Sequence, residues 1–396
     1  MLLPVEEGKQ LIREHTVALQ AVSLPLEKCL SCVLAADVYA PQNIPAFRQS
    51  AMDGYAVNFN GWQQYRQLII AGEMAAGAIQ PLAITPQQAT RIFTGAPLPN
   101  GADTVVMQEK VWVAGDILHI QDEQLQAGAN VRDAGSEVQA GALAIAGGNV
   151  LTPAAIGFIA GAGIREVKIY PAPAISIIVT GNELQIPGLP LQYGQVYESN
   201  SFTLTAVLQQ MHISNVTVYR VQDDMQLLQQ TISTALQYTD MLLLTGGVSV
   251  GSYDYVADAL QHCGVQKVFH RLQQKPGKPL FFGKRNNQVI FGLPGNPSSV
   301  LTCFYEYVYP CIRQMMQFPV AELHTLQVPL LHAYSKKTGL THFLKGYYNG
   351  EGVTALHAQE SYRMQSFATS NCLIHLPAAQ QDFAQGQPVD IHVLPQ

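Results

Sequence analysis

Short apolar runs alternate with helix-like segments between residues 175 and 300, and this alternation limits the fold more than any other feature. The runs at 175–179, 216–219, 242–244 and 289–291 are typical of buried strands. Segments 202–208, 225–236 and 256–263, and the one that starts at Pro297, have the apolar spacing of helices. The alternation predicts a parallel sheet with right-handed crossovers and helices on both faces, which is a doubly wound α/β domain.

The rest of the chain indicates additional domains. A single core rarely grows past about 250 to 300 residues, and this chain has 396. Short alternating apolar runs at 104–108, 111–113 and 118–120, and again at 343–349, 353–357, 373–376 and 389–393, indicate β structure on both sides of the α/β segment. We therefore expect a multidomain α/β plus β protein. Its parts would be a discontinuous linking domain with helical and extended segments (1–46 and 140–171), a small inserted β domain (47–139), the α/β domain (172–318) and a C-terminal β domain (319–396).

Charge and composition exclude several classes of protein. The chain has 22 Lys and Arg against 28 Asp and Glu, with no basic stripe, so nucleic acid is not an expected partner. Residues 1–15 suit an amphipathic helix rather than a signal peptide, and no apolar run approaches the ~20 residues of a membrane span. A soluble, cytoplasmic protein is expected. Cys29 and Cys32 form a CxxC without a second pair, and we expect packed helix cysteines there rather than zinc or redox chemistry.

Polar and glycine-rich loops follow the predicted strands, at the end of the sheet where α/β proteins bind ligands. Their candidate residues are Thr180, Gly181, Asn182 and Glu183, then Asp223, then Thr245, Gly246, Gly247, Ser249 and Asp254, and then Pro294, Gly295, Asn296 and Ser299. Any one loop by itself is equally well explained as a turn and helix cap. Together, their backbone N–H groups and hydroxyls suit a phosphate or another tetrahedral oxyanion, so we expect the loops to converge.

Two further features support an anion site. Asn296 and Pro297 are placed as helix cap and first helical residue, which leaves free N–H groups beside Ser298 and Ser299. Prolines stiffen the turn that carries Lys275 and Lys278, which favours an oxyanion clamp over ordinary surface lysines.

Carboxylates near these loops suit a metal ion that accompanies a phosphate. Glu183, Asp223 and Asp254 are hard oxygen ligands of the kind Mg²⁺ prefers, although Asp223 or Asp224 could instead cap the helix at 225–236. The phosphate-binding motif of P-loop proteins and the glycine fingerprint of dinucleotide-binding proteins are both absent from the sequence.

Six short motifs occur in an order that resembles one family. They are SAMDGYAV at 50–57, TGAPLP at 94–99, TGNEL at 180–184, GGVSVG at 246–251, KPGKP at 275–279 and GLPGNP at 292–297. Their combination resembles the molybdopterin molybdenumtransferases, known as MoeA in bacteria and as the gephyrin E domain in animals, over nearly the whole chain. The resemblance implies insertion of molybdate into adenylylated molybdopterin with release of AMP. It also implies Mg²⁺ or another divalent cation, and a homodimer whose active site lies between subunits.

Roles for single residues come from this resemblance. Molybdate would be held by Lys275, Lys278, Ser299 and Ser361, and the metal and the nucleotide would be bound by Glu183, Asp223 and Asp254. Two residues of the other subunit, Asp53 and Thr94, would reach the site across the dimer interface. The pterin substrate would be bound by Thr180, Gly181, Thr245, Gly246, Gly247, Ser249, Pro294, Gly295 and Asn296. The molybdopterin adenylyltransferase is an expected partner. Two alternatives stay open: a molybdopterin-binding scaffold or carrier without turnover, and an adenylyltransferase acting on molybdopterin.

The chain departs from the family pattern at several positions. Asn182, Glu198 and Glu137 stand where the family often has Asp, and His342 replaces a more usual Asp without an assigned role. Lys345 stands where an Arg that contacts molybdate is usual. Because Lys keeps the charge but loses the planar fork of Arg, we expect weaker molybdate affinity without loss of turnover.

Overall fold

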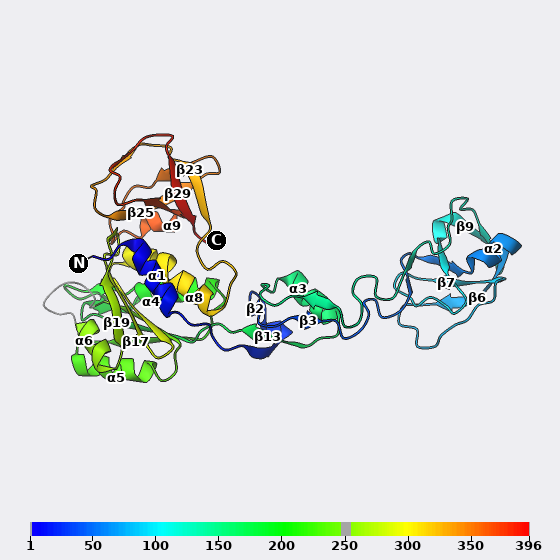
Figure 1. Ribbon diagram of the computed structural model, residues 1–396, viewed down its shortest axis with the longest axis horizontal. Helices are drawn as coiled ribbons and strands as arrows, with labels where there is room; N and C mark the ends of the chain where they lie inside the picture. The colour runs from blue at the N-terminus through cyan, green and yellow to red at the C-terminus, as the bar shows by residue number, and fades with distance from the viewer. Residues whose placement is uncertain (1, 247–254, 396) are drawn as a thin grey trace. The chain divides into compact units, whose positions relative to one another are not determined.

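The computed structural model describes residues 2–246 and 255–395, which form two compact units (Figure 1). The larger unit contains the residues up to Val22, residues 31–33 and the residues from Lys168 onward. The smaller unit contains residues 23–30 and 34–167. None of the helices in the described part of the chain has the length and hydropathy that a membrane crossing requires.

A six-stranded sheet forms the centre of the larger unit. Its order is β17 (Val216–Val221), β14 (Ile175–Thr180), β18 (Met241–Thr245), β22 (Gln288–Leu293), β21 (Pro279–Arg285) and β19 (Gln266–Arg271). The first four strands are parallel, which confirms the predicted core of the sheet. The last two, which the sequence pattern does not predict, are antiparallel and extend the sheet at this edge. Arg285 pairs with Gln288 around Asn286, whose φ is 55°, and such a two-residue turn makes a hairpin rather than a crossover.

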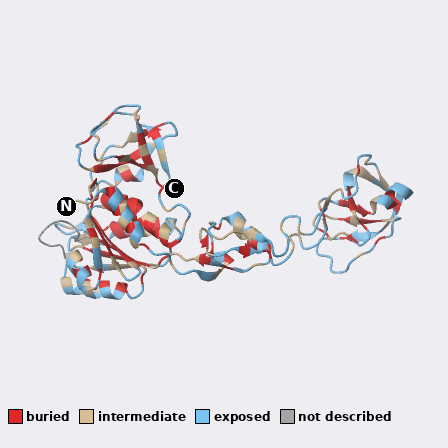
Figure 2. Ribbon diagram, in the orientation of Figure 1, coloured by how far each residue is buried: buried red, intermediate tan, exposed pale blue. Residues whose placement is uncertain are grey.

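Helices cover both faces of this sheet. They are α4 (Asn200–Gln210), α7 (Pro297–Cys303) and α8 (Tyr309–Met315) on one face, and α5 (Met225–Ala235) and α6 (Tyr255–His262) on the other. Alternate residues of one strand divide between two cores, since Ile177 packs with Leu204 whereas Ile178 packs with Leu228. Figure 2 shows these strands as buried. Burial on both faces explains why their sequences read as continuous apolar runs.

The N-terminal helix and a π-helical turn complete this half of the larger unit. Helix α1 (Val5–His15) is amphipathic as predicted, with Val5 and Ile12 buried. Between α7 and α8 the chain forms a single π-helical segment, η3 (Phe304–Val308), whose residues are all buried. Glu306 of η3 pairs with Lys9 of α1 at 2.7 Å, so the turn is tied to the N-terminal helix.

The C-terminal sheet also includes one strand from the α/β segment, β20. Its order is β20 (Gln274–Lys275), β25 (Thr341–Tyr348), β27 (Cys372–Leu376), β29 (Pro388–Val393) and β23 (Thr325–Pro329), with β26 (Val353–Ala355) paired to β25. Four of these strands fall where the sequence predicts them. Strand β20 lies parallel to β25, and Lys275 is in register with His342. The C-terminal sheet therefore holds the segment that carries Lys275.

The smaller unit is mostly β structure. Its main sheet has the order β8 (Thr104–Met107), β5 (Gly54–Val57), β7 (Gln88–Ile92), β6 (Gln67–Met74), β10 (Ile117–Ile120) and β9 (Val111–Ala114). This confirms the strands predicted near 104, 111 and 118. The prediction of helix cysteines was wrong, because Cys29 follows a 3-10 turn, Leu26–Lys28, and Cys32 precedes β2 (Val33–Leu34). The other elements include α2 (Phe59–Tyr65) and α3 (Pro153–Gly161), while β1 (Val22–Pro25) and β13 (Glu166–Tyr170) lie where the chain passes from one unit to the other.

Candidate functional site

The side chain of Asn200, the first residue of α4, connects the ends of two strands of the central sheet, β18 and β22. Its amide nitrogen donates to the Thr245 hydroxyl at 2.8 Å and to the Gly295 carbonyl at 2.9 Å. Asn200 is 8% exposed, so these bonds are shielded from water. The predicted convergence is confirmed for the described loops, whereas Gly247, Ser249 and Asp254 lie outside the described residues.

Gly246 brings the loop after β18 against the end of β14. Its φ is +90°, and a Cβ on this residue would lie 2.0 Å from the Thr180 carbonyl oxygen. No side chain fits at that distance from a backbone atom, so this position requires glycine. The neighbouring Thr245 is 1% exposed. The backbone therefore requires glycine at position 246 whether or not a ligand binds there.

Asp223 is held in place by the loop after β14. The Thr180 hydroxyl donates to Asp223 Oδ1 at 2.5 Å, and the Asn182 backbone N–H donates to Oδ2 at 3.3 Å. The Asp223 N–H in turn donates to the Asn182 side-chain oxygen at 3.1 Å. The adjacent Asp224 caps α5 by accepting from Leu227 N at 2.8 Å. Asp224, and not Asp223, is therefore the residue that caps α5, and the Asp223 carboxylate is not needed for capping.

Glu183 supplies a second carboxylate close to the same loop. Its Oε2 atom lies 2.9 Å from where a Cβ on Gly181 would be, so the side chain lies back over its own turn. Carboxylate oxygens suit a hard divalent cation. Within residues 2–246 and 255–395 no group of three or more His, Cys, Asp or Glu could hold a metal, so any such site needs a ligand from outside these ranges, such as Asp254, or from water and substrate.

The turn at 275–279, here called the lysine turn, is built around the buried side chain of Gln274. Its amide nitrogen donates to the Pro276 carbonyl at 3.1 Å and to the Gly277 carbonyl at 3.0 Å. Lys275 and Lys278 are exposed, and neither ammonium group has a hydrogen bond or ion pair within the described part of the chain. The two cations are therefore available to an anion.

Ser361 connects the C-terminal domain to the turn that begins α7. The Asn296 amide donates to the Ser361 hydroxyl at 2.9 Å, and the Ser298 N–H donates to the Ser361 carbonyl at 3.1 Å. Asn296 and Pro297 occupy the predicted cap and first helical positions, but the Asn296 side chain does not cap the helix. The prediction that the N–H of Ser298 is free was wrong, because a loop distant in sequence uses it. Ser299 is 3% exposed.

Lys345 is buried and is bonded to the loop that carries Ser361. Its ammonium donates to the carbonyls of Ala358 at 2.6 Å and Arg363 at 2.9 Å, with Glu360 O at 3.5 Å. The side chain is on β25 and the residue is 2% exposed. Burial lowers the pKa of this lysine. The segment 358–363 is here called the Ser361 loop. The ammonium of Lys345 donates its hydrogen bonds to this loop and not to an open anion site.

A pocket of about 230 Å³ lies beside Lys275. It is lined by Lys275, Pro276, Tyr334, His342, Phe343, Leu344, Ala358, Gln359 and Glu360. Burial, followed by the charges of Lys336 and Lys275, lowers the pKa of His342 to about 4. His342, which is in register with Lys275, is therefore neutral near neutral pH and leaves the charge of Lys275 unchanged.

Asp53 and Thr94 form a pair in the smaller unit. The Thr94 backbone N–H and hydroxyl donate to Asp53 Oδ1 at 2.7 and 2.8 Å. These bonds lower the pKa of Asp53. The carboxylate is therefore fixed and ionised, and Oδ2 has no partner within the described residues.

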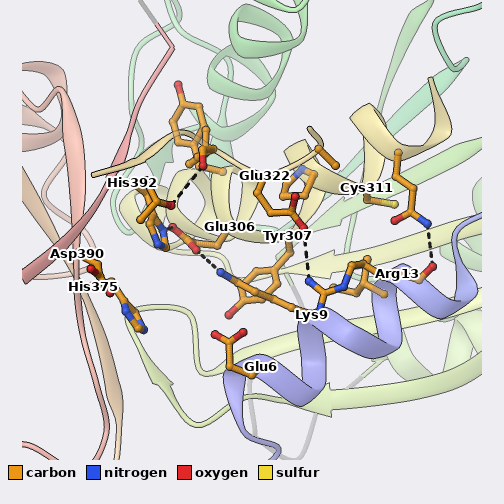
Figure 3. Close-up of a pocket in the computed structure, with 17 residues that line it drawn as sticks. Glu6, Lys9, Arg13, Glu306, Tyr307, Cys311, Glu322, His375, Asp390 and His392 are labelled. Atoms are coloured by element: carbon orange, nitrogen blue, oxygen red, sulfur yellow. Dashed lines mark hydrogen bonds and ion pairs between the residues drawn. The ribbon is translucent and has the colours of Figure 1, made fainter. Parts of the chain in front are cut away.

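A second pocket, of about 280 Å³, lies between α1, η3 and the C-terminal sheet (Figure 3). Its floor contains Glu306, which accepts from Lys9 at 2.7 Å and contacts His392 Nδ1 at 2.6 Å. Burial alone would raise the pKa of Glu306, but Lys9 and His392 together lower it to about 2. None of the candidate site residues lines this pocket.

Sequence reasoning missed Asn200, Gln274, Tyr307 and Gln359. Asn200 precedes the helix-like segment at 202–208 and Gln274 precedes the lysine motif, but neither has a sequence feature that distinguishes it. Gln359 exchanges hydrogen bonds of 3.0 and 2.9 Å with the backbone of Lys345. Asn200, Gln274 and Tyr307 are buried and Gln359 is half-buried, and each bonds a residue distant in sequence, which local patterns do not reveal.

Comparison with known proteins agrees with this architecture. Three family models match: the MoeA N-terminal region (domain I and II) over residues 3–163, a probable molybdopterin binding domain over 176–314, and the MoeA C-terminal region (domain IV) over 327–394. The molybdopterin molybdenumtransferase of Haemophilus influenzae is 33% identical over 401 residues, covering 99% of this chain and 98% of that protein.

Further relatives give the same result. The molybdopterin molybdenumtransferase 2 of Mycobacterium tuberculosis is 30% identical over 401 residues, covering 98% of each chain. The solved structure of a molybdopterin biosynthesis MoeA protein from Pyrococcus horikoshii OT3 has a TM-score of 0.78 and 25% identity, with 100% of both chains covered. The chain therefore belongs to the MoeA family of molybdopterin molybdenumtransferases.

Proposed function

We propose that this protein is a molybdopterin molybdenumtransferase, which inserts molybdate into the dithiolene of adenylylated molybdopterin and releases AMP. The observation that carries the proposal is the lysine turn. It presents two uncompensated ammonium groups, and its strand β20 joins the C-terminal sheet that also holds the Ser361 loop. A tetrahedral dianion and a phosphate anhydride are both ligands that lysines, hydroxyls and helix N-termini bind.

Molybdate would be held by Lys275, Lys278 and Ser299, with Ser361 alongside. The hydrogen bonds between Ser361 and the turn at Asn296 support this grouping, since they bring a C-terminal residue to the start of α7. Lys345 would not contact molybdate itself but would hold the Ser361 loop in place. The pterin substrate would contact the strand-end loops, at Thr180, Gly181, Thr245, Gly246, Gly247, Ser249, Pro294, Gly295 and Asn296.

A divalent cation, Mg²⁺ or one of similar chemistry, would bind Glu183, Asp223 and Asp254. Asp223 supports this role, because Thr180 and Asn182 orient its carboxylate while Asp224 serves as the helix cap. When bound, the cation would neutralise charge on the phosphate oxygens of the substrate. Oxygen ligands suit Mg²⁺ and Mn²⁺ alike.

The proposal includes partners. A homodimer would place Asp53 and Thr94 of one subunit at the loops of the other, and the fixed, ionised Asp53 supports a role in binding. The molybdopterin adenylyltransferase would supply the adenylylated substrate in the cytoplasm. A carrier without turnover is not favoured, because the full-length relatives are named as transferases. A free-standing adenylyltransferase would not have the MoeA N-terminal and C-terminal regions found on both sides of the central domain.

The site assignment is tested by AMP release from variants given adenylylated molybdopterin, Mg²⁺ and molybdate. We expect Lys275→Ala and Asp223→Ala to lose most of the activity, by about 10²-fold or more, since the first removes a positive charge at the molybdate site and the second removes a ligand of the proposed cation. Lys267→Ala, at an exposed lysine on β19, is the matched control and should stay active. Full activity in both site variants would refute the assignment.

A further inference from the structure

The lysine turn rests on one face of the helical segment formed by α7 and η3. A Cβ on Gly277 would lie 2.4 Å from Cys303 Sγ and 3.8 Å from the Ser299 carbonyl oxygen. Ser299, Cys303 and Tyr307 follow one another at intervals of four residues, so they share this face. The helical segment that begins at the Asn296 turn therefore also forms the support beneath the two lysines.

Tyr307 fastens the turn to this support through Gln274. The Tyr307 hydroxyl donates to Gln274 Oε1, and the amide nitrogen of the same side chain donates to the carbonyls of Pro276 and Gly277. Tyr307 is 1% exposed and Gln274 is 0% exposed. Water cannot replace a bond at such a depth, so each partner depends on the other.

The π-helical turn η3 determines where Tyr307 lies. Such turns are rare and are frequently found at functional sites. Its Glu306 is fixed from two directions by Lys9 and His392, and the Lys9 ammonium lies 5.8 Å from the centre of the Tyr307 ring (Figure 3). Burial raises the pKa of Tyr307, so the phenol stays protonated and remains a donor.

We infer that Tyr307 and Gln274 are positioning residues, which hold the lysine turn so that Lys275 and Lys278 present a preformed site to a tetrahedral oxyanion. The inference rests on the proposed function, in which this turn binds molybdate. Neither residue touches the anion. Their loss should therefore weaken molybdate binding while leaving the chemistry and the pterin site unchanged.

The test is the molybdate dependence of AMP release in Tyr307→Phe, which removes only the hydroxyl. We expect KM for molybdate to rise about three- to ten-fold, the range for one lost hydrogen bond, with kcat and KM for the pterin substrate within about two-fold of the unsubstituted protein. Tyr305→Phe is the matched control, since Tyr305 lies on the same π-helical turn and is 7% exposed but does not bond Gln274. It should keep the original KM for molybdate.

Two outcomes separate this inference from the proposed function. If Lys275→Ala raises KM for molybdate but Tyr307→Phe matches Tyr305→Phe, the positioning role is wrong and the proposed function stands. If AMP release in the unsubstituted protein does not depend on molybdate, the proposed function fails first. If Tyr307→Phe unfolds below the assay temperature, Gln274→Met removes the same bond together with the bonds to the Pro276 and Gly277 carbonyls, and KM for molybdate should rise at least as much with kcat again within about two-fold.

Discussion

Single buried charges organise the larger unit, and Lys345 is the clearest case. Its ammonium donates charge-assisted hydrogen bonds to the carbonyls of Ala358, Glu360 and Arg363, in addition to the Ser366 hydroxyl at Ala358 and the Arg363 N–H at Glu360. Lys345→Met should lower the free energy of unfolding by about 1.5 to 3 kcal/mol, because it removes the charge-assisted hydrogen bonds that hold the Ser361 loop. Thermal or chemical melts measure this, with Lys337→Met at an exposed position as the control. Equal melts would contradict the structural role.

Glu306 should make stability depend on pH in a defined window. Its pKa is lowered from an ordinary value of 4.5 to about 2 in the folded protein. A depressed carboxyl pKa contributes stability above the unfolded value, and this contribution is lost as pH falls through the folded value. The stability difference between the unsubstituted protein and Glu306→Gln should be fully present at about pH 5 and shrink as pH falls from about 4.5 to 2. A stability difference that does not change over this interval would show that Lys9 and His392 do not lower the pKa of Glu306.

Between elements, the contact of the Ser361 loop with the start of α7 joins the C-terminal domain to the α/β core. A double-mutant cycle with Asn296→Ala and Ser361→Ala should give a coupling energy of about 0.5 to 1.5 kcal/mol, because the two side chains share one hydrogen bond of 2.9 Å. Unfolding melts of the two single variants and the double variant supply the three values. Additive effects would mean that the loop does not dock on this turn in solution.

Element-scale features divide clearly into those that the sequence predicts and those that it does not. Strands of the central sheet and their loops are predictable, because burial on both faces leaves uninterrupted apolar runs such as β18. The strand β20 is not, since two residues of a polar turn pair with β25, which is more than 60 residues distant in sequence. For the same reason the contacts of Asn200 with Thr245 and of Tyr307 with Gln274 leave no periodic signal.

For the whole molecule, the proposed shared active site predicts complementation between subunits. Asp53→Ala and Lys275→Ala should each be inactive alone. After mixing and subunit exchange at equal amounts, half of the dimers would be mixed and each would have one intact site. About a quarter of the original activity should then return. AMP release by the mixture measures this, and a mixture no more active than either variant would contradict a site built from two subunits.

Transfer of molybdate to the pterin is the central claim. The most direct measurement is the rate of AMP release from adenylylated molybdopterin as molybdate is titrated at fixed Mg²⁺. The account predicts a rate that is negligible without molybdate, rises and saturates with it, and shifts to higher molybdate in Lys278→Ala. AMP release that is already maximal without molybdate, or that never exceeds the rate without protein, would contradict it.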